Sequence, residues 1–311
     1  MAAWSRVVGV GAVLALACSP REGTSPASAE SGRSSGTSGT GTGTGTGTSR
    51  EESEGAPGSV GSPGCGKASR AGASAQKVNA LGKSRAFTLV VPEGYSPQVP
   101  YPLVVVLHGG GGSAAGARAQ TDLEKVAGGR ALFVYPEAAG GTWNLDAPTS
   151  SNGDVALFDA ILLFAHNALC VDAHRVFLTG FSNGAYMANQ LACKRGERIR
   201  AIVTHAGGGP YETSGTYDAT GQLVCPGKAV ASLVVHGSSD GTVPPSEGQK
   251  SIDHWSYANR CSGGTTSALV PPCVALQGCL QPVGTCKIPG LGHGLWSQAG
   301  KITWSFFDAL K

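Results

Sequence analysis

The sequence predicts an α/β fold in which a doubly wound, mostly parallel sheet carries helices on both faces. Short apolar runs typical of buried strands alternate with helix-like segments along residues 84–310. One of these runs leads directly into the motif Gly-x-Ser-x-Gly at residues 180–184, a pattern typical of a strand, a tight turn and a helix. Other polar residues of catalytic type also follow apolar runs, and the carboxyl ends of parallel strands meet at one edge of a sheet.

The first half of the predicted domain contains one central strand. The run Leu103 to Leu107 is unbroken, which predicts a central strand covered on both faces. We expect Asp154, at the start of a helix that follows an irregular stretch, to accept hydrogen bonds from free N–H groups near the helix N-terminus. In chain order, the predicted elements are a strand, a turn, the central strand, a helix, a strand and the irregular stretch, at residues 84–91, 92–97, 103–107, 114–127, 131–135 and 136–153.

The second half repeats the alternation around the serine motif. A strand at residues 175–179 delivers Ser182, and a helix follows at residues 186–193. Its N-terminus points back at the serine and should stabilise negative charge there. Two further strands and a closing helix complete the predicted domain, at residues 199–204, 229–235 and 302–310.

Ser182 is the candidate nucleophile, and a serine hydroxyl needs a base and an orienting carboxylate to react. Asp240 comes shortly after an apolar strand, and His293 stands in the segment Gly-Leu-Gly-His-Gly before the closing helix. The chain order serine, aspartate, histidine is that of the α/β-hydrolases. The sequence therefore predicts this fold, with Ser182, Asp240 and His293 as a catalytic triad. Asp218 and Asp253 are weaker candidates for the carboxylate because neither follows a buried apolar run.

A glycine run after the central strand predicts the donors that would stabilise an oxyanion. This chemistry needs two backbone N–H groups, one next to the nucleophile and one from a glycine loop. We expect Asn183 to provide the first, and Gly110 or Gly111 to provide the second, with His108 shaping the turn. A phosphate-binding loop is the competing interpretation, but the pattern G-x-x-x-x-G-K-[ST] is absent.

The first 63 residues are expected to lie outside the folded domain. Residues 1–18 combine a basic start with an apolar run and read as a secretory signal peptide, too short to be a stable membrane helix. The segment before Cys18 also resembles a bacterial lipobox, although its leucine lies one position too early, so lipidation and ordinary cleavage both stay open. Residues 19–63, rich in Ser, Gly and Thr, cannot form a core and predict a disordered linker. The folded domain is expected at residues 64–311.

This export signal predicts an extracellular protein, either released or held at the outer cell surface by a lipid anchor. Nine cysteines in an exported chain indicate disulfides rather than a metal site. With Cys18 set aside, the even number that remains fits four disulfides, whose pairing the sequence leaves open. Zinc is the rival interpretation, but the close C-x-x-C pairs that it favours are missing. The cysteines expected to pair are Cys65, Cys170, Cys193, Cys225, Cys261, Cys273, Cys279 and Cys286.

Charge and chemistry limit the partners. The net charge is only +3, without a dense Lys/Arg tract, so nucleic acid is not expected as a partner. The predicted reaction needs no cofactor or metal, because a serine triad and backbone donors suffice. We expect a monomer whose contact with a membrane, if Cys18 is lipidated, is through that anchor.

Several segments resemble secreted feruloyl esterases, which belong with polyhydroxybutyrate depolymerases and acetylxylan esterases among the α/β-hydrolases. The resemblance covers essentially all of residues 64–311 and includes the cysteine framework. It implies hydrolysis of carboxylic esters on plant cell-wall polysaccharide, with Ser182, Asp240 and His293 as the triad. The segments that carry it are residues 62–67, 100–110, 169–172, 175–184, 191–193, 277–279 and 292–293.

Two departures from that family leave the substrate less defined than the mechanism. Tyr186 stands where the family often continues a glycine run, and we expect its ring to narrow the crevice. Trp296 follows His293 in a segment typical of neither the feruloyl nor the polyester type. Trp143 and Trp296 lie in loops that should flank the crevice, where an aromatic platform for a sugar or phenolic group competes with plain packing.

Other functions are therefore weighed against feruloyl esterase activity. A polyhydroxybutyrate depolymerase or an acetylxylan esterase would use the same triad. A peptidase is less favoured because no propeller-like domain is present to gate peptides. Outside the enzymes, the alternative is a surface lipoprotein that binds polysaccharide without catalysis.

Overall fold

The computed structural model describes residues 61–213, 215–267 and 270–310. The expected signal peptide, Cys18 and nearly all of the expected linker lie outside the described residues. The described chain begins at Gly61, and Ser62 is already buried on the domain. The Ser62 hydroxyl donates to the carbonyl of Leu169 at 2.6 Å and accepts from the N–H of Val171 at 2.9 Å. These contacts fasten the start of the domain to its centre.

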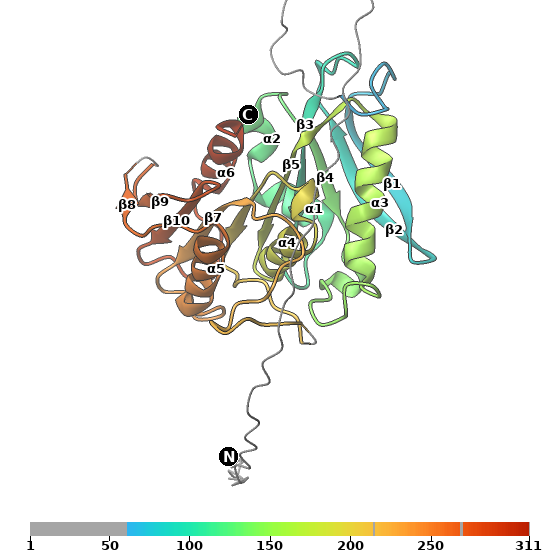
Figure 1. Ribbon diagram of the computed structural model, residues 1–311. Helices are drawn as coiled ribbons and strands as arrows, with labels where there is room; N and C mark the ends of the chain where they lie inside the picture. Colours follow the sequence, from blue (N-terminus) through green and yellow to red (C-terminus); the bar gives the residue numbers. More distant parts are fainter. Residues whose placement is uncertain (1–60, 214, 268–269, 311) are drawn as a thin grey trace, which may run out of the picture. The chain divides into compact units, whose positions relative to one another are not determined.

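A mixed sheet forms the middle of the molecule (Figure 1). In the described residues its strand order is β1-β2-β4-β3-β5-β6-β7-β10-β9-β8. The strands from β4 to β10 in this order run parallel, while β1 and β2 at one edge and β9 and β8 at the other are antiparallel. The strands are β1 (Gly72–Ala80), β2 (Lys83–Val91), β3 (Tyr101–Leu107), β4 (Leu132–Pro136), β5 (Val171–Phe181), β6 (Ala201–His205), β7 (Ala231–Gly237), β8 (Thr265–Thr266), β9 (Cys273–Leu276) and β10 (Val283–Ile288).

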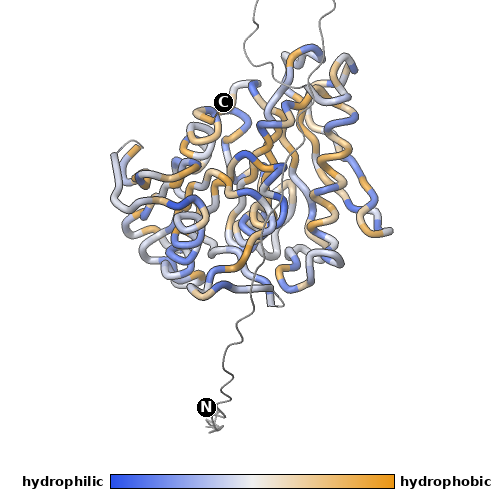
Figure 2. The backbone as a smooth tube through the Cα atoms, viewed as in Figure 1, coloured by the Kyte–Doolittle hydropathy of each residue, from blue (hydrophilic) through white to orange (hydrophobic). Residues whose placement is uncertain are grey.

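Helices cover both faces of this sheet. Helices α3, α4 and α5 pack on one face, and α1, α2 and α6 on the other (Figure 1). Each face has its own hydrophobic core. Along β3, Leu103 and Val105 belong to the core on the side of α3, α4 and α5, whereas Val104 and Val106 belong to the core on the side of α1, α2 and α6, as expected for side chains that alternate along a strand. The hydrophobic colour of the central strands follows this double burial (Figure 2). The helices are α1 (Ala114–Gln120), α2 (Leu123–Ala127), α3 (Gly153–Ala168), α4 (Asn183–Lys194), α5 (Pro245–Ala258) and α6 (Ala299–Asp308), with short 3₁₀ turns η1 (Ala139–Gly141) and η2 (Gly196–Arg198).

The predicted α/β-hydrolase architecture is confirmed, but two local expectations are wrong. The helix expected over residues 114–127 is two helices, because Thr121 adopts an extended backbone at φ −120° and ψ 141° between them. Asp154 lies in the first turn of α3 as expected, but it does not accept from the free N–H groups of that helix. The side chain of Asn152 does so, accepting from the N–H groups of Asp154 and Val155 at 2.9 and 3.3 Å. Asp154 is instead buried in an ion pair with Arg85, with an N–O distance of 2.6 Å.

Three larger elements were not predicted. Strand β1 is an edge strand whose side chains are mostly exposed, so it lacks the apolar run of a central strand. Helix α5 begins at two prolines and contains Gly248, all of which are poor helix formers. Its buried side, centred on Ile252 and Trp255, is therefore hard to recognise from the sequence. Strand β10 mixes polar and apolar residues, although it lies inside the sheet between β7 and β9. Its parallel pairing with β7 is what positions the loop that carries His293.

Four disulfides reinforce the domain, and together they contain all eight cysteines expected to pair. Since these thiols are paired with one another, the zinc alternative is wrong. One disulfide joins the start of the domain to the entrance of β5, one joins α4 to the segment before β7, and two join elements at the β8–β10 edge. The pairs are Cys65–Cys170, Cys193–Cys225, Cys261–Cys279 and Cys273–Cys286.

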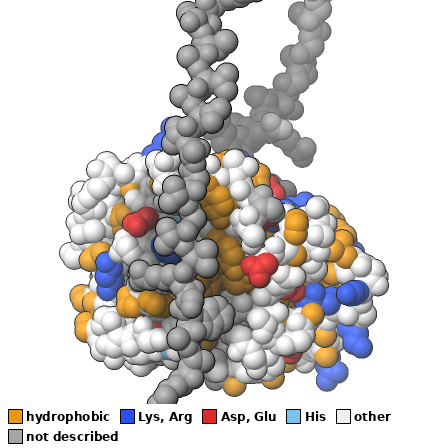
Figure 3. All heavy atoms as spheres, turned by 90° about the horizontal axis from the view of Figure 1, so that it is seen from below, with side chains coloured by type: hydrophobic (Ala, Val, Ile, Leu, Met, Phe, Trp, Pro, Cys, Tyr) orange, Lys and Arg blue, Asp and Glu red, His pale blue; other side chains and the backbone are white. Residues whose placement is uncertain are grey.

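The surface of the domain is mixed in character. Seen from below, hydrophobic side chains form small groups between polar atoms, and acidic side chains stand singly (Figure 3). Over the part of the chain that the structure describes, no helix combines the length and the apolar character needed to cross a bilayer.

Two histidines are buried where protonation is unfavourable. His205, at the end of β6, lies with its Nε2 3.0 Å from the hydroxyl oxygen of Thr303 on α6. His254, on α5, lies against the Cys193–Cys225 disulfide. Burial lowers the pKa of His205 from 6.5 to about 4. Burial also lowers the pKa of His254 to about 4, although the charge of Asp218 acts in the opposite direction.

These lowered pKa values predict an acid-sensitive fold. Between pH 6.5 and about 4 the unfolded chain binds protons at His205 and His254 while the folded chain does not, so the free energy of unfolding falls as pH falls. Each histidine adds up to about 1.4 kcal/mol per pH unit to this slope. Urea unfolding between pH 7 and 4.5 should show a shallower slope for His254→Gln than for the wild type. The exposed His174 provides the control, His174→Gln, and equal slopes for the two variants would contradict this origin of acid sensitivity.

Candidate active site

Ser182 occupies a strained turn between β5 and α4. Its backbone has φ 52° and ψ −122°, a conformation that costs a non-glycine residue about 1–3 kcal/mol. The glycines of the motif make the turn sterically feasible. A Cβ on Gly180 would lie 2.2 Å from the carbonyl oxygen of Gly184, and a Cβ on Gly184 would lie 2.4 Å from the carbonyl oxygens of Leu107 and His108. Strand β3, the turn and α4 thus meet with no room for a side chain.

The structure brings Ser182, His293 and Asp240 together in one hydrogen-bonded chain. The Nε2 of His293 lies 3.0 Å from the hydroxyl oxygen of Ser182, and its Nδ1 lies 2.8 Å from Oδ2 of Asp240. Because β10 pairs with β7, the loops after these two strands run side by side. The N–H of Ser239 donates to the carbonyl of Leu291 at 3.0 Å, which holds the two loops together.

Asp240 is set up to accept and not to donate. It is only 4% exposed, and its Oδ1 accepts from the N–H groups of Thr242 and Val243 at 2.9 Å each. Burial alone would raise the pKa of Asp240, but the hydrogen bonds from His293 and these two N–H groups outweigh it and lower that pKa. A carboxylate that only accepts requires the proton of His293 on Nδ1, which leaves Nε2 free to accept from the Ser182 hydroxyl.

The other carboxylates considered from the sequence lie elsewhere. Asp218 is half-buried and accepts from the hydroxyl and N–H of Thr220 at 2.7 and 2.9 Å. Asp253 is exposed on α5 and accepts from Gln249 at 2.8 Å. His236, at the end of β7, also lies near Asp240: its Nε2 donates to the carbonyl of Val243 at 2.9 Å and lies 3.5 Å from Oδ2 of Asp240.

The glycine loop after β3 offers one free N–H where two glycines were considered. The N–H of Gly111 donates to the carbonyl of Gly141 at 2.8 Å, so Gly111 is not a free donor and that expectation is wrong. Gly110 lies beside Asn183, with a built Cβ 3.6 Å from the Asn183 Cβ. Gly110 lies in no helix or strand, and among the described residues its N–H donates to no backbone carbonyl. The N–H of Asn183 is also free of an intrahelical acceptor, because it begins α4.

Trp143 is buried against this loop, so its ring does not form an aromatic platform. Its side chain is 3% exposed, its Nε1 donates to the carbonyl of His108 at 2.8 Å, and its ring packs at a tilt of 36° against the His108 imidazole. The backbone N–H of Trp143 donates to Oδ1 of Asn183 at 2.7 Å, and Nδ2 of Asn183 donates back to the Trp143 carbonyl. His108 contacts the turn as predicted, because its Nδ1 donates to the carbonyl of Gly109 at 2.8 Å, while its Nε2 accepts from the N–H of Ala138 at 3.1 Å.

A cavity of about 740 Å³ opens beside Ser182. Tyr186 lies in its wall, as expected for a ring that narrows the crevice, and its hydroxyl donates to Oε2 of Glu247 at 3.2 Å. Trp296 is partly buried against the core that contains α6, and neither Trp143 nor Trp296 lines this cavity. The lining residues missed by sequence reasoning include Tyr211, Tyr217, Leu223 and Glu247, which belong to an irregular loop and to the unpredicted α5.

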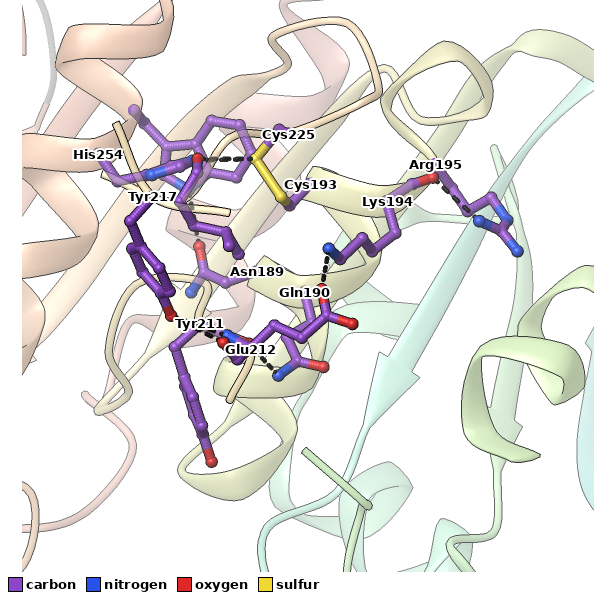
Figure 4. Close-up of a disulfide and its surroundings, with 12 residues drawn as sticks. Asn189, Gln190, Cys193, Lys194, Arg195, Tyr211, Glu212, Tyr217, Cys225 and His254 are labelled. Atoms are coloured by element: carbon purple, nitrogen blue, oxygen red, sulfur yellow. Dashed lines mark hydrogen bonds and ion pairs between the residues drawn. A yellow bond between two sulfur atoms is a disulfide. The ribbon is translucent and has the colours of Figure 1, made fainter. Parts of the chain in front are cut away.

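The loop between β6 and β7 forms one wall of the cavity and is fastened to the helix of the nucleophile. Cys193 of α4 is bonded to Cys225, and Lys194 pairs with Glu212 (Figure 4). Gln190 donates from Nε2 to the carbonyl of Tyr211 at 2.6 Å. The preceding residue, Asn189, donates to the carbonyl of Gly208 at 2.8 Å and accepts from the indole of Trp255 at 2.7 Å. The wall and the nucleophile are therefore carried by the same helix.

Known proteins resemble this chain in sequence and in fold. The model of the phospholipase/carboxylesterase family matches residues 158–267. Feruloyl esterase C of Emericella nidulans is 32% identical over 80% of this chain and 91% of its own length. Feruloyl esterase D of Neurospora crassa is 30% identical over 79% of this chain and 90% of its own length. An acetyl xylan esterase from Aspergillus awamori superimposes with a TM-score of 0.60 over 75% of this chain and 99% of its own, and at 17% identity it shows the fold alone.

The disulfide between α4 and the wall predicts a local effect on the loop. Replacing both Cys193 and Cys225 by Ala should lower the free energy of unfolding by about 2–4 kcal/mol and should speed chymotrypsin cleavage at Tyr211 and Tyr217. Limited proteolysis under folded conditions, with the fragments mapped by mass spectrometry, measures this. The matched control replaces Cys261 and Cys279, which form a bridge at the β8–β10 edge of the sheet. Equal cleavage of the loop in both double variants would show that the disulfide does not hold the wall.

Proposed function

The chain belongs to the feruloyl esterase family of the α/β-hydrolases, and we propose that it hydrolyses feruloyl esters of plant cell-wall polysaccharide. Membership of this family makes the chain a carboxylic-ester hydrolase. The observation that carries the proposal further is the hydrogen-bonded chain of Ser182, His293 and Asp240, which lies beside a cavity large enough for an aromatic acid.

The first half of the proposed reaction forms an acyl-enzyme. Nε2 of His293 takes the proton of the Ser182 hydroxyl as its oxygen attacks the ester carbonyl. The oxyanion accepts hydrogen bonds from the N–H groups of Asn183 and Gly110, while Asp240 stabilises the imidazolium of His293. The ester C–O bond then breaks, and the departing alcohol takes the proton from His293.

The second half releases the acid and restores Ser182. His293 removes a proton from water, whose oxygen attacks the acyl carbonyl. The bond to the oxygen of Ser182 breaks, and His293 returns its proton to that oxygen. Every proton passes through Nε2 of His293, and water is the only reactant besides the ester.

The size and lining of the cavity favour an aromatic acyl group over the alternatives. A cavity of about 740 Å³ with Tyr186 and Tyr211 in its wall is far larger than an acetyl group needs, which argues against an acetylxylan esterase. A polyhydroxybutyrate depolymerase would use the same triad but has no evident need for the tyrosines. A non-catalytic polysaccharide-binding lipoprotein would need neither the strained serine nor the hydrogen-bonded histidine.

We propose in addition that the protein acts outside the cell as a monomer. The disulfides support an oxidising location. The signal peptide, the linker and lipidation of Cys18 remain proposals from the sequence, as does attachment to the cell surface.

Removing the nucleophile should abolish turnover and leave the fold intact. Ser182→Ala is expected to lower kcat for methyl ferulate by a factor of about 10⁴ or more, because the covalent step is lost. A fluorophosphonate probe should label Ser182 in the wild type and nothing in the variant, and the melting temperatures should be similar. More than residual hydrolysis by the variant would contradict the assignment, and failure of the wild type to react would favour a binding protein.

Asp240 should matter through the orientation of His293. Asp240→Asn replaces an acceptor by an amide that can donate to Nδ1, so the wrong tautomer is favoured and kcat should fall by up to about 10⁴. The comparison variant is Asp218→Asn, which alters the other carboxylate considered as the orienting group. Steady-state kinetics with methyl ferulate should show near-normal kcat for that variant, and the reverse order of effects would assign the orienting carboxylate to Asp218.

A further inference from the structure

We propose that the cavity beside Ser182 binds the acyl half of the ester and that Glu247, together with Tyr186, accepts a hydrogen bond from a hydroxyl group on the acyl ring. The enzyme would then select aromatic acids with a free ring hydroxyl over those whose hydroxyl is missing or methylated. This inference rests on the proposed hydrolysis at Ser182.

The lining of the cavity indicates which half of the ester it receives. Ser182 and Asn183 belong to the lining, whereas His293 does not. The leaving alcohol must take its proton from Nε2 of His293, so the alcohol lies beside that imidazole. The acyl group extends from the same carbonyl carbon in another direction. The cavity that starts at Ser182 and Asn183 without including His293 is therefore the one open to the acyl group.

The walls near the serine suit a flat aromatic group. Tyr186 belongs to α4, one helical turn after Ser182. Tyr211 comes from the loop that is fastened to the same helix, as Figure 4 shows. The two rings stand edge to face, with centroids 6.3 Å apart. Leu145 and Leu223 add apolar surface to the lining. Aromatic rings favour such offset and edge-to-face contacts, which orient a third ring placed among them.

The polar part of the cavity offers acceptors for a hydrogen-bond donor. Oε2 of Glu247 accepts from the Tyr186 hydroxyl at 3.2 Å, and Oε1 accepts from Nζ of Lys250 at 2.5 Å. A carboxylate has about four lone-pair sites, so Glu247 keeps unused acceptor capacity. The Glu247 side chain is 26% exposed and remains open to a ligand. The Tyr186 hydroxyl has already donated its proton, so its oxygen can also accept.

Charge at this position reinforces the choice of a neutral donor. Glu247 lies in the first turn of α5, where the helix dipole stabilises a carboxylate. Burial, followed by the charge of Glu247, raises the pKa of Tyr186 above its ordinary value, so this hydroxyl stays protonated. Glu247 and Asp253 outnumber Lys250 among the charged groups of the lining, which disfavours an acyl group that carries a negative charge there.

Three methyl esters test the proposal: p-coumarate with a free ring hydroxyl, 4-methoxycinnamate with a methylated one, and unsubstituted cinnamate. The measured quantity is the ratio of kcat/KM for p-coumarate to that for 4-methoxycinnamate. For the wild type we expect this ratio to be about 10–100, because a hydrogen bond to a charged group contributes a free energy of that order. Glu247→Ala should lower it to near unity, and Tyr186→Phe should lower it part of the way.

Asp253→Asn is the matched comparison, because Asp253 lines the same cavity without contacting Tyr186. This variant should keep the wild-type ratio. A ratio that survives Glu247→Ala, or that is lost only in Asp253→Asn, would overturn the assignment to Glu247. Cleavage of all three esters by the wild type at equal rates would overturn the selection itself while leaving ester hydrolysis established. If the wild type cleaves none of them, the proposed function fails together with this inference.

Discussion

The arrangement of the site depends on one backbone turn, in which a non-glycine residue is held at φ 52° between β5 and α4. The strain is maintained because the neighbouring contacts leave no alternative path. Gly184 lies directly against the carbonyl oxygens at the end of β3, and Gly180 lies against Gly184 itself. The same close approach places the N–H of Asn183 next to the glycine loop that follows β3. A single packing constraint thus sets the positions of the nucleophile and of both proposed oxyanion donors.

The order of strands in the sheet supplies the remaining partners. Ser182, Asp240 and His293 follow β5, β7 and β10, three strands of the parallel part of the sheet whose carboxyl ends lie at one edge. The cavity is attached to the same framework, since α4 carries Ser182 at its N-terminus and holds the loop wall through the Cys193–Cys225 disulfide at its other end. Movement of the wall relative to the serine is therefore restricted by covalent and polar contacts along one helix.

The parts of this arrangement that the sequence could predict are those with a strong local signal. Buried strands such as residues 103–107 appear as unbroken apolar runs, and the serine motif identifies its turn directly. Strand β10 could not be recognised because its mixture of polar and apolar residues is typical of a half-buried edge strand. In the structure it lies between β7 and β9. For Trp143 the sequence left an aromatic platform and plain packing open, because a loop position does not reveal that the indole turns inward to bond the carbonyl of His108.

The cavity wall was the least predictable part. Glu247 and Tyr211 approach Ser182 only through the docking of α5 and of an irregular loop, and neither has a motif or a periodicity of its own. In the same way, the free N–H of Gly110 can be distinguished from that of Gly111 only by the partner that Gly111 finds at Gly141. Such features depend on contacts between distant segments, which local sequence patterns do not encode.

The most direct test of the account is to trap the covalent intermediate. The enzyme is mixed with 4-nitrophenyl ferulate, quenched in acid within milliseconds and digested for peptide mass spectrometry. The account predicts a burst of nitrophenol close to one equivalent per enzyme and a feruloyl group on the peptide that contains Ser182. A feruloyl group on another residue, or the absence of both burst and modified peptide, would contradict it.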